Sequence, residues 1–299
     1  MLKTIPIQTS ARADDPEVDR SRGDGTHEIR PDVAYQRVAI VNVVFVGARN
    51  AGDRGWVLID AGIPGSAAMI ASAAARRYGQ TSRPAAIILT HGHFDHVGAL
   101  KTLSERWETP IYAHILEHPY LDGTSSYPAP DPSVGGGLMA WLSPLYPRGP
   151  INVAGRLRAM GLHGEVPFMP GWRWLFTPGH TPGHISFWRE SDRTLIAGDA
   201  FVTTAQESAY AVATQTPALH GPPAYYTQDW QKSRESVRTL AALEPEVAVT
   251  GHGRAMRGPQ MRRALHTLAN NFDAVATPGQ GRYVERPAKV TSGGAYVTP

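Results

Sequence analysis

Four side chains that commonly bind metal ions, His91, His93, Asp95 and His96, lie within six consecutive residues of the chain. Neutral imidazole and carboxylate groups are good ligands for zinc and related divalent ions. A bound cation would also remove the repulsion among imidazoles that become protonated so close together. Gly92 is expected to permit a sharp turn that points the first two histidines the same way. The string predicts a metal site, and a histidine-rich surface loop is the alternative.

Three further candidate ligands follow predicted strands further along the chain. His180 lies in the segment Thr-Pro-Gly-His-Thr-Pro-Gly-His, Asp199 follows Ile-Ala-Gly, and His252 follows Val-Thr-Gly. Loops held at strand ends by a rigid scaffold are where proteins often place binding groups. We expect these three residues to converge with the first four.

Other histidines and one carboxylate are weaker candidates. His184, four residues after His180, is expected to support a ligand by hydrogen bonding, as groups around metal-bound histidine often do. Asp60 ends a predicted strand and is expected to form a turn or to support a ligand. The histidines interpreted as packed or solvated are His114, His118, His163 and His266, and His27 has no assigned role.

Strands and helices must alternate to position these residues. β-Branched residues 38–46 and apolar residues 56–59 flank a turn at 50–55, which predicts a hairpin. An alanine-rich helix is expected at 66–78, where a glycine follows, and a short buried strand at 85–89 leads to the histidine string. This order of elements indicates an α/β layered fold.

The remaining elements continue the same pattern. Apolar residues recur every three or four positions from Val97 to Trp107, which predicts a helix directly after the histidine string. Asp229 is expected to cap a helix that ends before Pro245, and Pro259 to open the last helix. Further strands are expected at 111–113, 172–176, 185–188, 194–197 and 247–249.

Two segments differ from this core. Polar residues 1–30 are expected to form a flexible N-terminal extension, which leaves 31–299 as the folded domain. Residues 120–171 are rich in proline, glycine and aromatic residues and are too long for an ordinary connection, so we expect an inserted, lid-like segment. Its aromatic side chains, Trp141 among them, either line an apolar pocket over the metals or form a small core of their own.

The complete ligand pattern resembles the metallo-β-lactamase superfamily of hydrolases. The resemblance rests on the string His-x-His-x-Asp-His at 91–96 and on the distant His180, Asp199 and His252, and it extends from about residue 38 to the last helix. It implies a four-layer αββα sandwich. It also implies that His91, His93 and His180 hold one metal ion, that Asp95, His96 and His252 hold a second, and that Asp199 bridges the two.

The resemblance implies hydrolysis by a dinuclear centre. The centre is expected to hold two divalent ions, of which zinc is the first choice and manganese, iron or cobalt are the alternatives. These ions would generate a bridging hydroxide that attacks a carbonyl carbon. Asp95 is expected to be catalytic, because it would orient the hydroxide and pass its proton to the leaving group. A bridging aspartate is typical of the glyoxalase II-like and lactonase-like branches, which favours a small carboxylic ester, lactone or thioester as substrate.

Some features leave the substrate open. Lactonases of this fold usually carry a tyrosine three residues after the bridging aspartate, where this chain has Val202, and Tyr210, Tyr225 and Tyr226 are candidates to replace it. No set of basic residues for glutathione is evident near the C-terminus. The alternative functions are a phosphodiesterase or nuclease, which the dispersed charge disfavours, and a mononuclear iron sulfur dioxygenase, which the full ligand set disfavours.

Composition narrows the remaining classes. The 299 residues include no cysteine, which excludes disulfides, thiolate ligands and a thiol nucleophile. The net charge of +3 comes from dispersed lysine and arginine, so no nucleic-acid partner is expected. No apolar run reaches the roughly 18 residues of a membrane helix, and no signal-peptide pattern is evident at the N-terminus. We expect a cytoplasmic enzyme with a small-molecule substrate and no membrane partner. The sequence leaves its oligomeric state open, and a homodimer is one of the options.

Overall fold

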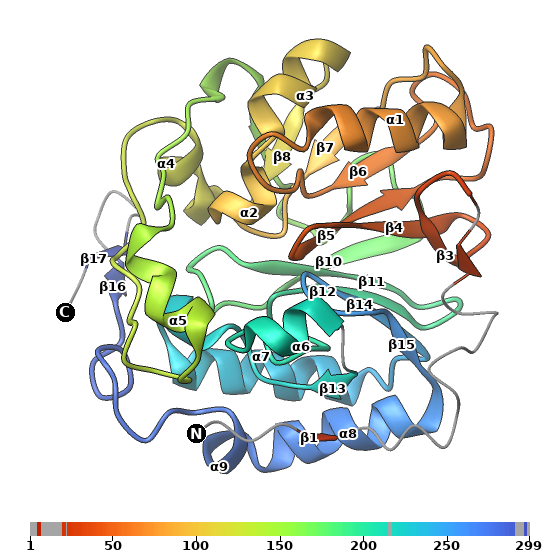
Figure 1. Cartoon of the computed structure of the whole chain (residues 1–299). Helices are drawn as coiled ribbons and strands as arrows, with labels where there is room; N and C mark the ends of the chain where they lie inside the picture. The colour runs from red at the N-terminus through yellow and green to blue at the C-terminus, as the bar shows by residue number, and fades with distance from the viewer. Residues whose placement is uncertain (1–4, 7–19, 22, 215–216, 291–295, 298–299) are drawn as a thin grey trace.

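The computed structural model describes residues 5–6, 20–21, 23–214, 217–290 and 296–297. Two β-sheets face each other at its centre, and helices cover the outer face of each sheet (Figure 1). This order of layers is the predicted four-layer αββα sandwich. Within the part of the chain that the structure describes, no helix is long and apolar enough to cross a membrane.

The N-terminal sheet has eight strands, in the order β2-β3-β4-β5-β6-β7-β8-β9. Its strands pair antiparallel from β2 to β6 and parallel from β6 to β9. The single strand expected at 38–46 is interrupted, because Ala39, with φ 56°, turns the chain between β4 and β5. The strands are β2 Arg20–Ser21, β3 His27–Arg30, β4 Val33–Val38, β5 Val41–Val46, β6 Val57–Ile59, β7 Ala86–Ile88, β8 Ile111–Ala113 and β9 Leu157–Ala159.

The C-terminal sheet has five strands, in the order β10-β11-β12-β14-β15. Only the β12–β14 pair within it is parallel. Two small ribbons, β1 with β13 and β16 with β17, lie outside these two sheets. The strands are β10 Trp172–Phe176, β11 Ile185–Arg189, β12 Thr194–Gly198, β14 Val247–Thr250, β15 Met256–Arg257, β1 Ile5–Pro6, β13 Ala218–Leu219, β16 Lys289–Val290 and β17 Tyr296–Val297.

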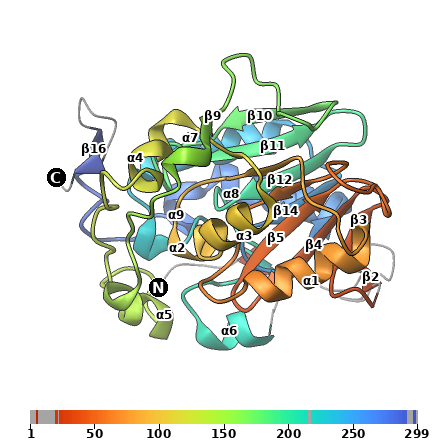
Figure 2. The same cartoon turned by 90° about the horizontal axis from the view of Figure 1, so that it is seen from above.

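The helices form the two outer layers and the connections. Helices α1 Ala67–Tyr78, α2 Phe94–Val97 and α3 Leu100–Trp107 cover the N-terminal sheet, and the view from above shows α1 beside β4 and β5 (Figure 2). Helices α7 Trp230–Ala242 and α8 Gly258–Asn270 cover the C-terminal sheet. The shorter ones are α4 His118–Leu121, α5 Leu138–Leu142, α6 Ala209–Thr214, α9 Phe272–Val275, η1 Ile115–Glu117, η2 Ser143–Leu145, η3 Ala154–Arg156 and η4 Ala224–Tyr226.

Two details of the helices follow from local sequence. The Asp229 side chain accepts a hydrogen bond from the Lys232 backbone N–H at 3.0 Å, so it caps α7 as expected. The helix expected to follow the histidine string is divided, because Gly98 and Ala99 separate α2 from α3. As a result, Asp95 and His96 lie inside a short helix of their own.

The continuous apolar run within strand β5 requires that the N-terminal sheet be covered on both faces. Its side chains alternate between two cores: Val43 and Phe45 pack with the α1 and α3 layer, whereas Val44 and Val46 pack toward the second sheet. There they join Phe187, Ile196 and Val249 of the C-terminal sheet. Successive strand residues point to opposite faces, so a continuous apolar strand fits only a sheet buried on both sides. Each fully buried side chain of this size contributes about 1.5–3 kcal/mol.

The parallel strands direct the candidate ligands to one edge of the sandwich. In the N-terminal sheet, β6 is followed by Asp60 and β7 leads to His91. In the C-terminal sheet, β12 is followed by Asp199 and β14 leads to His252. Because the carboxyl ends of parallel neighbours meet at one edge, each sheet places two of these residues side by side.

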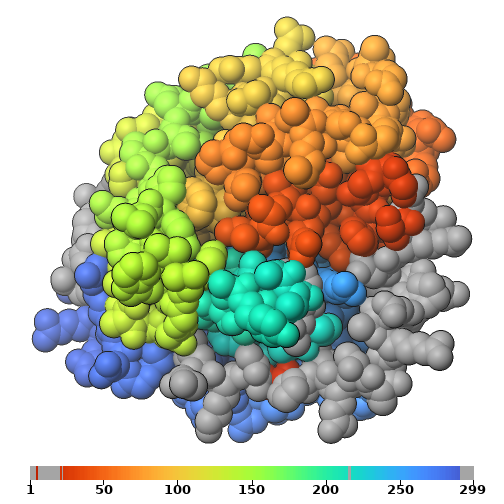
Figure 3. All heavy atoms as spheres, viewed as in Figure 1, coloured from red at the N-terminus to blue at the C-terminus, as the bar shows by residue number. Residues whose placement is uncertain are grey.

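Residues 120–171 form the inserted segment, which contains α5, η2, η3 and β9. Its last part rejoins the N-terminal sheet through β9. Tyr120, Tyr127 and Val134 are buried, whereas Trp141 is 71% exposed and contributes to no core. On the face shown in Figure 3, the segment lies beside α6, coloured teal.

Residues 27–30, which were expected to lie in the flexible extension, belong to the N-terminal sheet. Strand β3, at 27–30, pairs with β4, and Ile29 is buried. Glu28 accepts hydrogen bonds from Arg49 and Arg77, each at 3.1 Å, which fixes this strand to α1 and to the turn after β5. The folded domain therefore begins before residue 31. Most of the expected extension, at 1–4, 7–19 and 22, lies outside the described residues.

Candidate metal centre

The structure brings all seven predicted ligands together, and all seven are buried. Their donor atoms form three overlapping groups, in each of which the atoms lie within 4.8 Å of one another. The first group is His91, His93 and His180, and the second group is Asp95, His96 and His252. The remaining set, His91, His96 and Asp199, shares a histidine with each of them.

The first group has the spacing of ligands around one ion. His93 Nδ1 lies 3.0 Å from His91 Nε2 and 2.9 Å from His180 Nε2. Nitrogens bound to one tetrahedral zinc ion at about 2.0–2.1 Å stand about 3.4 Å apart, so a small expansion of this cluster accommodates a cation. The three imidazoles therefore fit a divalent ion.

The second group and the neighbouring Asp199 contain polar atoms that no described residue satisfies. His96 Nε2 and Asp199 Oδ1 are buried with no hydrogen-bond partner among the described residues. His252 Nε2 lies 3.5 Å from Asp95 Oδ2. An unpaired buried nitrogen or carboxylate oxygen is costly, and a cation between them would satisfy both. These residues also fit a divalent ion.

Asp199 lies between the two groups. Its Oδ2 is 3.5 Å from His180 Nε2 and 3.1 Å from His252 Nε2, and its Oδ1 is 3.6 Å from His96 Nε2. One carboxylate thus faces histidines of both groups, which is the arrangement expected of a bridging ligand. Gly251 is required beside it, because a side chain there would collide with the carboxylate.

Hydrogen bonds behind the ligands fix their ring orientation. His96 Nδ1 donates to Asp60 Oδ2 at 2.8 Å, and His252 Nδ1 donates to the Ile40 carbonyl at 2.6 Å. These acceptors favour the tautomer that keeps its proton on Nδ1, so that each Nε2 is the nitrogen available to a metal ion at the centre. Asp60 also accepts from the Thr90 backbone and hydroxyl, both at 2.8 Å, so the structure places it as a support for His96.

His184 lies beside the cluster without joining a ligand group. Its Nε2 accepts a hydrogen bond from the Asp199 backbone N–H at 2.9 Å, and its Nδ1 lies 2.9 Å from Thr177 Oγ1. Both ring nitrogens are therefore engaged, and the ring supports the backbone of Asp199.

Burial and neighbouring charges set the ionisation of the ligands. Burial lowers the pKa of His91 and His93 well below the usual histidine value, and that of His180 to about 3. Burial also opposes charge on His96, but nearby carboxylates, Asp199 first among them, raise its pKa well above normal. Burial alone would raise the pKa of Asp199, yet the charges of the neighbouring histidines hold it well below normal. The first group thus keeps the neutral imidazoles that bind metal.

Tyrosine side chains line one side of the centre. The rings of Tyr127 and Tyr226 lie 4.6 and 4.5 Å from that of His93, and Tyr146 lies 5.3 Å from Phe94. Tyr127 and Tyr146 come from the inserted segment, so this segment contacts the centre through these tyrosines. The hydroxyl of Tyr226 is buried with no hydrogen-bond partner among the described residues.

The other candidates lie apart from the ligand groups. Tyr210 is 76% exposed, and Val202 is fully buried. His114 stacks on Phe176 at 4.7 Å, and burial lowers its pKa to about 4. Of the remaining histidines, His27 stacks on Tyr35, His266 contacts Glu244, His163 is exposed and His118 is half-buried.

Sequence reasoning missed one residue at the centre and misjudged another. Glu117, at the end of η1, is buried and accepts hydrogen bonds from both histidine loops, but neither its spacing nor its neighbours in the sequence indicate this. Gly92 does not have the positive φ that a glycine-specific turn requires. A side chain there would instead bring its Cβ to 2.7 Å from the Tyr127 hydroxyl, so close packing explains the glycine.

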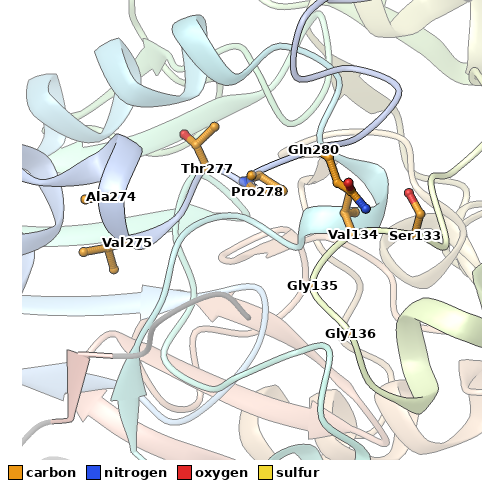
Figure 4. A pocket seen from close by; sticks show the side chains of 10 residues that line it. Ser133, Val134, Gly135, Gly136, Ala274, Val275, Thr277, Pro278 and Gln280 are labelled. Atoms are coloured by element: carbon orange, nitrogen blue, oxygen red, sulfur yellow. The ribbon is translucent and has the colours of Figure 1, made fainter.

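A surface cavity of about 520 Å³ lies between the inserted segment and the C-terminal residues. Val134 and Gln280 face it from opposite segments, with Ala274 and Val275 further along (Figure 4). None of the seven candidate ligands lines this cavity. The chemistry of the ligand cluster, rather than the size of this cavity, identifies the functional site.

Comparisons with known proteins show which proteins this chain is similar to. The chain is 46% identical over 238 residues to the probable metallo-hydrolase YflN of Bacillus subtilis (strain 168), which covers 80% of this chain and 90% of the relative. It is 29% identical over 170 residues to the probable metallo-hydrolase YybB of the same organism, covering 57% and 64%. A solved beta-lactamase domain protein from Burkholderia ambifaria has the same fold, with a TM-score of 0.57, 22% identity and coverage of 83% and 76%. The profile of the metallo-beta-lactamase superfamily matches residues 37–252, and the chain belongs to this superfamily.

Proposed function

We propose that the chain is a dinuclear metal-dependent hydrolase that cleaves a small carboxylic ester, lactone or thioester. The observation that carries the proposal is the position of Asp199 between two complete groups of ligands. The similarity to two probable metallo-hydrolases supports the hydrolytic part of the proposal.

The protein's own residues divide the work of this reaction. Two divalent ions, when bound, would activate a water molecule and polarise the substrate carbonyl. Asp95 lies at the second group, 3.5 Å from His252, where its carboxylate can take the proton of the attacking water and pass it to the leaving group. The tyrosines beside His93 and Phe94 exclude bulk water and offer an apolar wall to the acyl group.

Tyr226 is the residue that we assign to the substrate carbonyl. It lies on η4, and its ring contacts His93. Lactonases of this fold usually carry their tyrosine earlier in the chain, at the position that Val202 occupies here. Burial, with the charge of Asp95 adding to it, raises the pKa of its hydroxyl, so the phenol keeps its proton. A protonated donor beside the centre can stabilise the negative charge that develops on the carbonyl oxygen.

Replacing Tyr226 with phenylalanine tests this assignment. We expect kcat to fall by about 10²-fold, within the range for a lost oxyanion donor, while metal content stays unchanged. Tyr210→Phe is the matched control, because Tyr210 is exposed and should leave kcat at the wild-type value. Equal kcat for Tyr226→Phe and wild-type protein would contradict the role of this hydroxyl.

A substrate panel tests the proposed function itself. Purified, metal-loaded protein would be assayed with aryl and alkyl esters, lactones of several ring sizes, acyl thioesters and bis(4-nitrophenyl) phosphate. We expect turnover of at least one carboxylic substrate that disappears when a chelator removes the metal. Faster cleavage of the phosphodiester, or consumption of oxygen with a persulfide, would reject the proposed substrate class in favour of those activities.

A further inference from the structure

Glu117 is a buried carboxylate that hydrogen-bonds to both loops of the first ligand group. Its Oε1 accepts from the Thr181 hydroxyl at 2.8 Å and from the Gly183 backbone N–H at 2.7 Å. Its Oε2 accepts from the Gly92 backbone N–H at 2.9 Å and from the Tyr127 hydroxyl. All four donors are neutral groups.

The two oxygens of Glu117 serve different loops. Oε2 holds the loop after β7, which carries His91 and His93, whereas Oε1 holds the loop between β10 and β11, which carries His180. These loops extend from different sheets, and His91 and His93 of one loop meet His180 of the other at the first ligand group. The Glu117 side chain therefore bridges the two loops whose separation determines the geometry of the first ligand group.

Two glycines make room for this contact. A Cβ at Gly183 would lie 2.8 Å from Glu117 Cγ and 2.9 Å from its Oε1. A Cβ at Gly92 would lie 2.7 Å from the Tyr127 hydroxyl and 3.4 Å from Glu117 Oε2. Both loops approach the carboxylate by their backbone, at the positions where a side chain would prevent it.

Keeping a carboxylate in this place is costly unless its oxygens are fully hydrogen-bonded. An ionised group removed from water loses several kcal/mol of solvation, which only well-placed partners offset. Burial raises the pKa of Glu117, and the four donors oppose that effect by favouring the charged form. The partners of this carboxylate are neutral donors, three of them on the two ligand loops, rather than a cationic side chain. This placement points to a role at the metal centre.

We propose that Glu117 is a positioning residue for the first metal site. It fixes the distance between the loops that carry His91, His93 and His180, and so sets the affinity of this site for its ion. Through Tyr127 it also ties the inserted segment to the same loops. The inference rests on the proposed dinuclear centre and adds a residue that contacts neither metal nor substrate.

Glu117→Gln tests this role by metal titration. Glutamine keeps one oxygen and can serve one loop, while its amide N–H groups face the donors of the other loop. We expect the affinity for one of the two ions to fall by about 10- to 100-fold, the range for lost support of a metal ligand, while the other ion binds as before. The measurement is a stepwise Zn²⁺ titration of metal-free protein against a chromophoric chelator.

Three variants make the result specific. Tyr127→Phe removes one of the four donors and should weaken the same ion by a smaller factor. Glu105→Gln, on the exposed face of α3, should bind both ions like wild-type protein. Combining Glu117→Gln with His252→Ala, which removes a ligand of the second group alone, should leave a chain whose remaining site is the weakened one.

The outcomes separate this inference from the proposed function. Wild-type affinities in Glu117→Gln would overturn it, and so would an equal loss at both sites that follows a lower melting temperature of the metal-free protein. If wild-type protein itself binds a single ion, the dinuclear proposal fails. The role of Glu117 would still be tested, because Glu117→Gln must lower the affinity for that single ion.

Discussion

We expect Asp95→Asn to lower kcat by about two orders of magnitude or more, within the range for a lost general acid–base group. Asparagine has the size of aspartate and keeps one oxygen that can bind metal, but it cannot take up a proton. Asp95 is buried at the second ligand group beside His252, so bulk water has little access to take over its role in proton transfer. Kinetics and metal content would be measured on the same samples.

The leaving group separates proton transfer from a loss of metal. An alkoxide needs a proton as it departs, whereas 4-nitrophenolate does not. The loss of activity in Asp95→Asn should therefore be larger for alkyl esters than for 4-nitrophenyl esters. Activity close to wild type at full metal content, or an equal loss with both kinds of ester, would show that Asp95 does not carry this proton.

We expect Asp199→Asn to cause the largest loss, because this carboxylate faces histidines of both groups. The amide is neutral and offers one oxygen, so it cannot hold two cations close together. Metal content should fall from two ions to one or fewer. If the lost stabilisation is about 4 kcal/mol, kcat/KM falls by about 10³-fold.

Asp53→Asn is the control for this variant, since Asp53 pairs with Arg83 in an exposed turn and belongs to none of the ligand groups. It should keep two ions and wild-type kinetics. An Asp199→Asn protein that binds two ions with unchanged kcat/KM would show that the carboxylate does not bridge the groups.

Much of the centre could be predicted because its ligands follow strands or lie in one short string. His91, His93, Asp95 and His96 are neighbours in the sequence, and metal-binding residue types at such spacing are informative without a structure. Asp199 could be predicted because it follows an apolar strand after a glycine. The strand alternation that gives two buried sheets is equally local, as the residues of β5 demonstrate.

Residues that act through tertiary contacts could not be predicted. Glu117 contacts Gly92 and Gly183, which lie 25 and 66 positions away in the chain. The tyrosines beside His93 come from the inserted segment and from η4, and only folding brings them there. No local pattern encodes such contacts, since each depends on how two sheets approach each other.

The exposure of individual side chains in residues 120–171 could not be predicted. Trp141 has a large apolar surface, which suggests a core or pocket residue, yet it is 71% exposed. Tyr127, by contrast, is buried and hydrogen-bonds to Glu117. Exposure depends on which face of α5 meets the rest of the protein, and a five-residue helix has too few turns for a periodic pattern to reveal it.

The metal content of purified protein tests the central claim most directly. Metal-free protein would be reconstituted separately with Zn²⁺, Mn²⁺, Fe²⁺ and Co²⁺, freed of excess ion, and analysed by mass spectrometry of the elements against protein concentration. The seven-residue cluster predicts about two ions per chain with at least one of these metals. A content that never exceeds one ion per chain, in protein that is folded and fully reconstituted, would contradict the dinuclear centre.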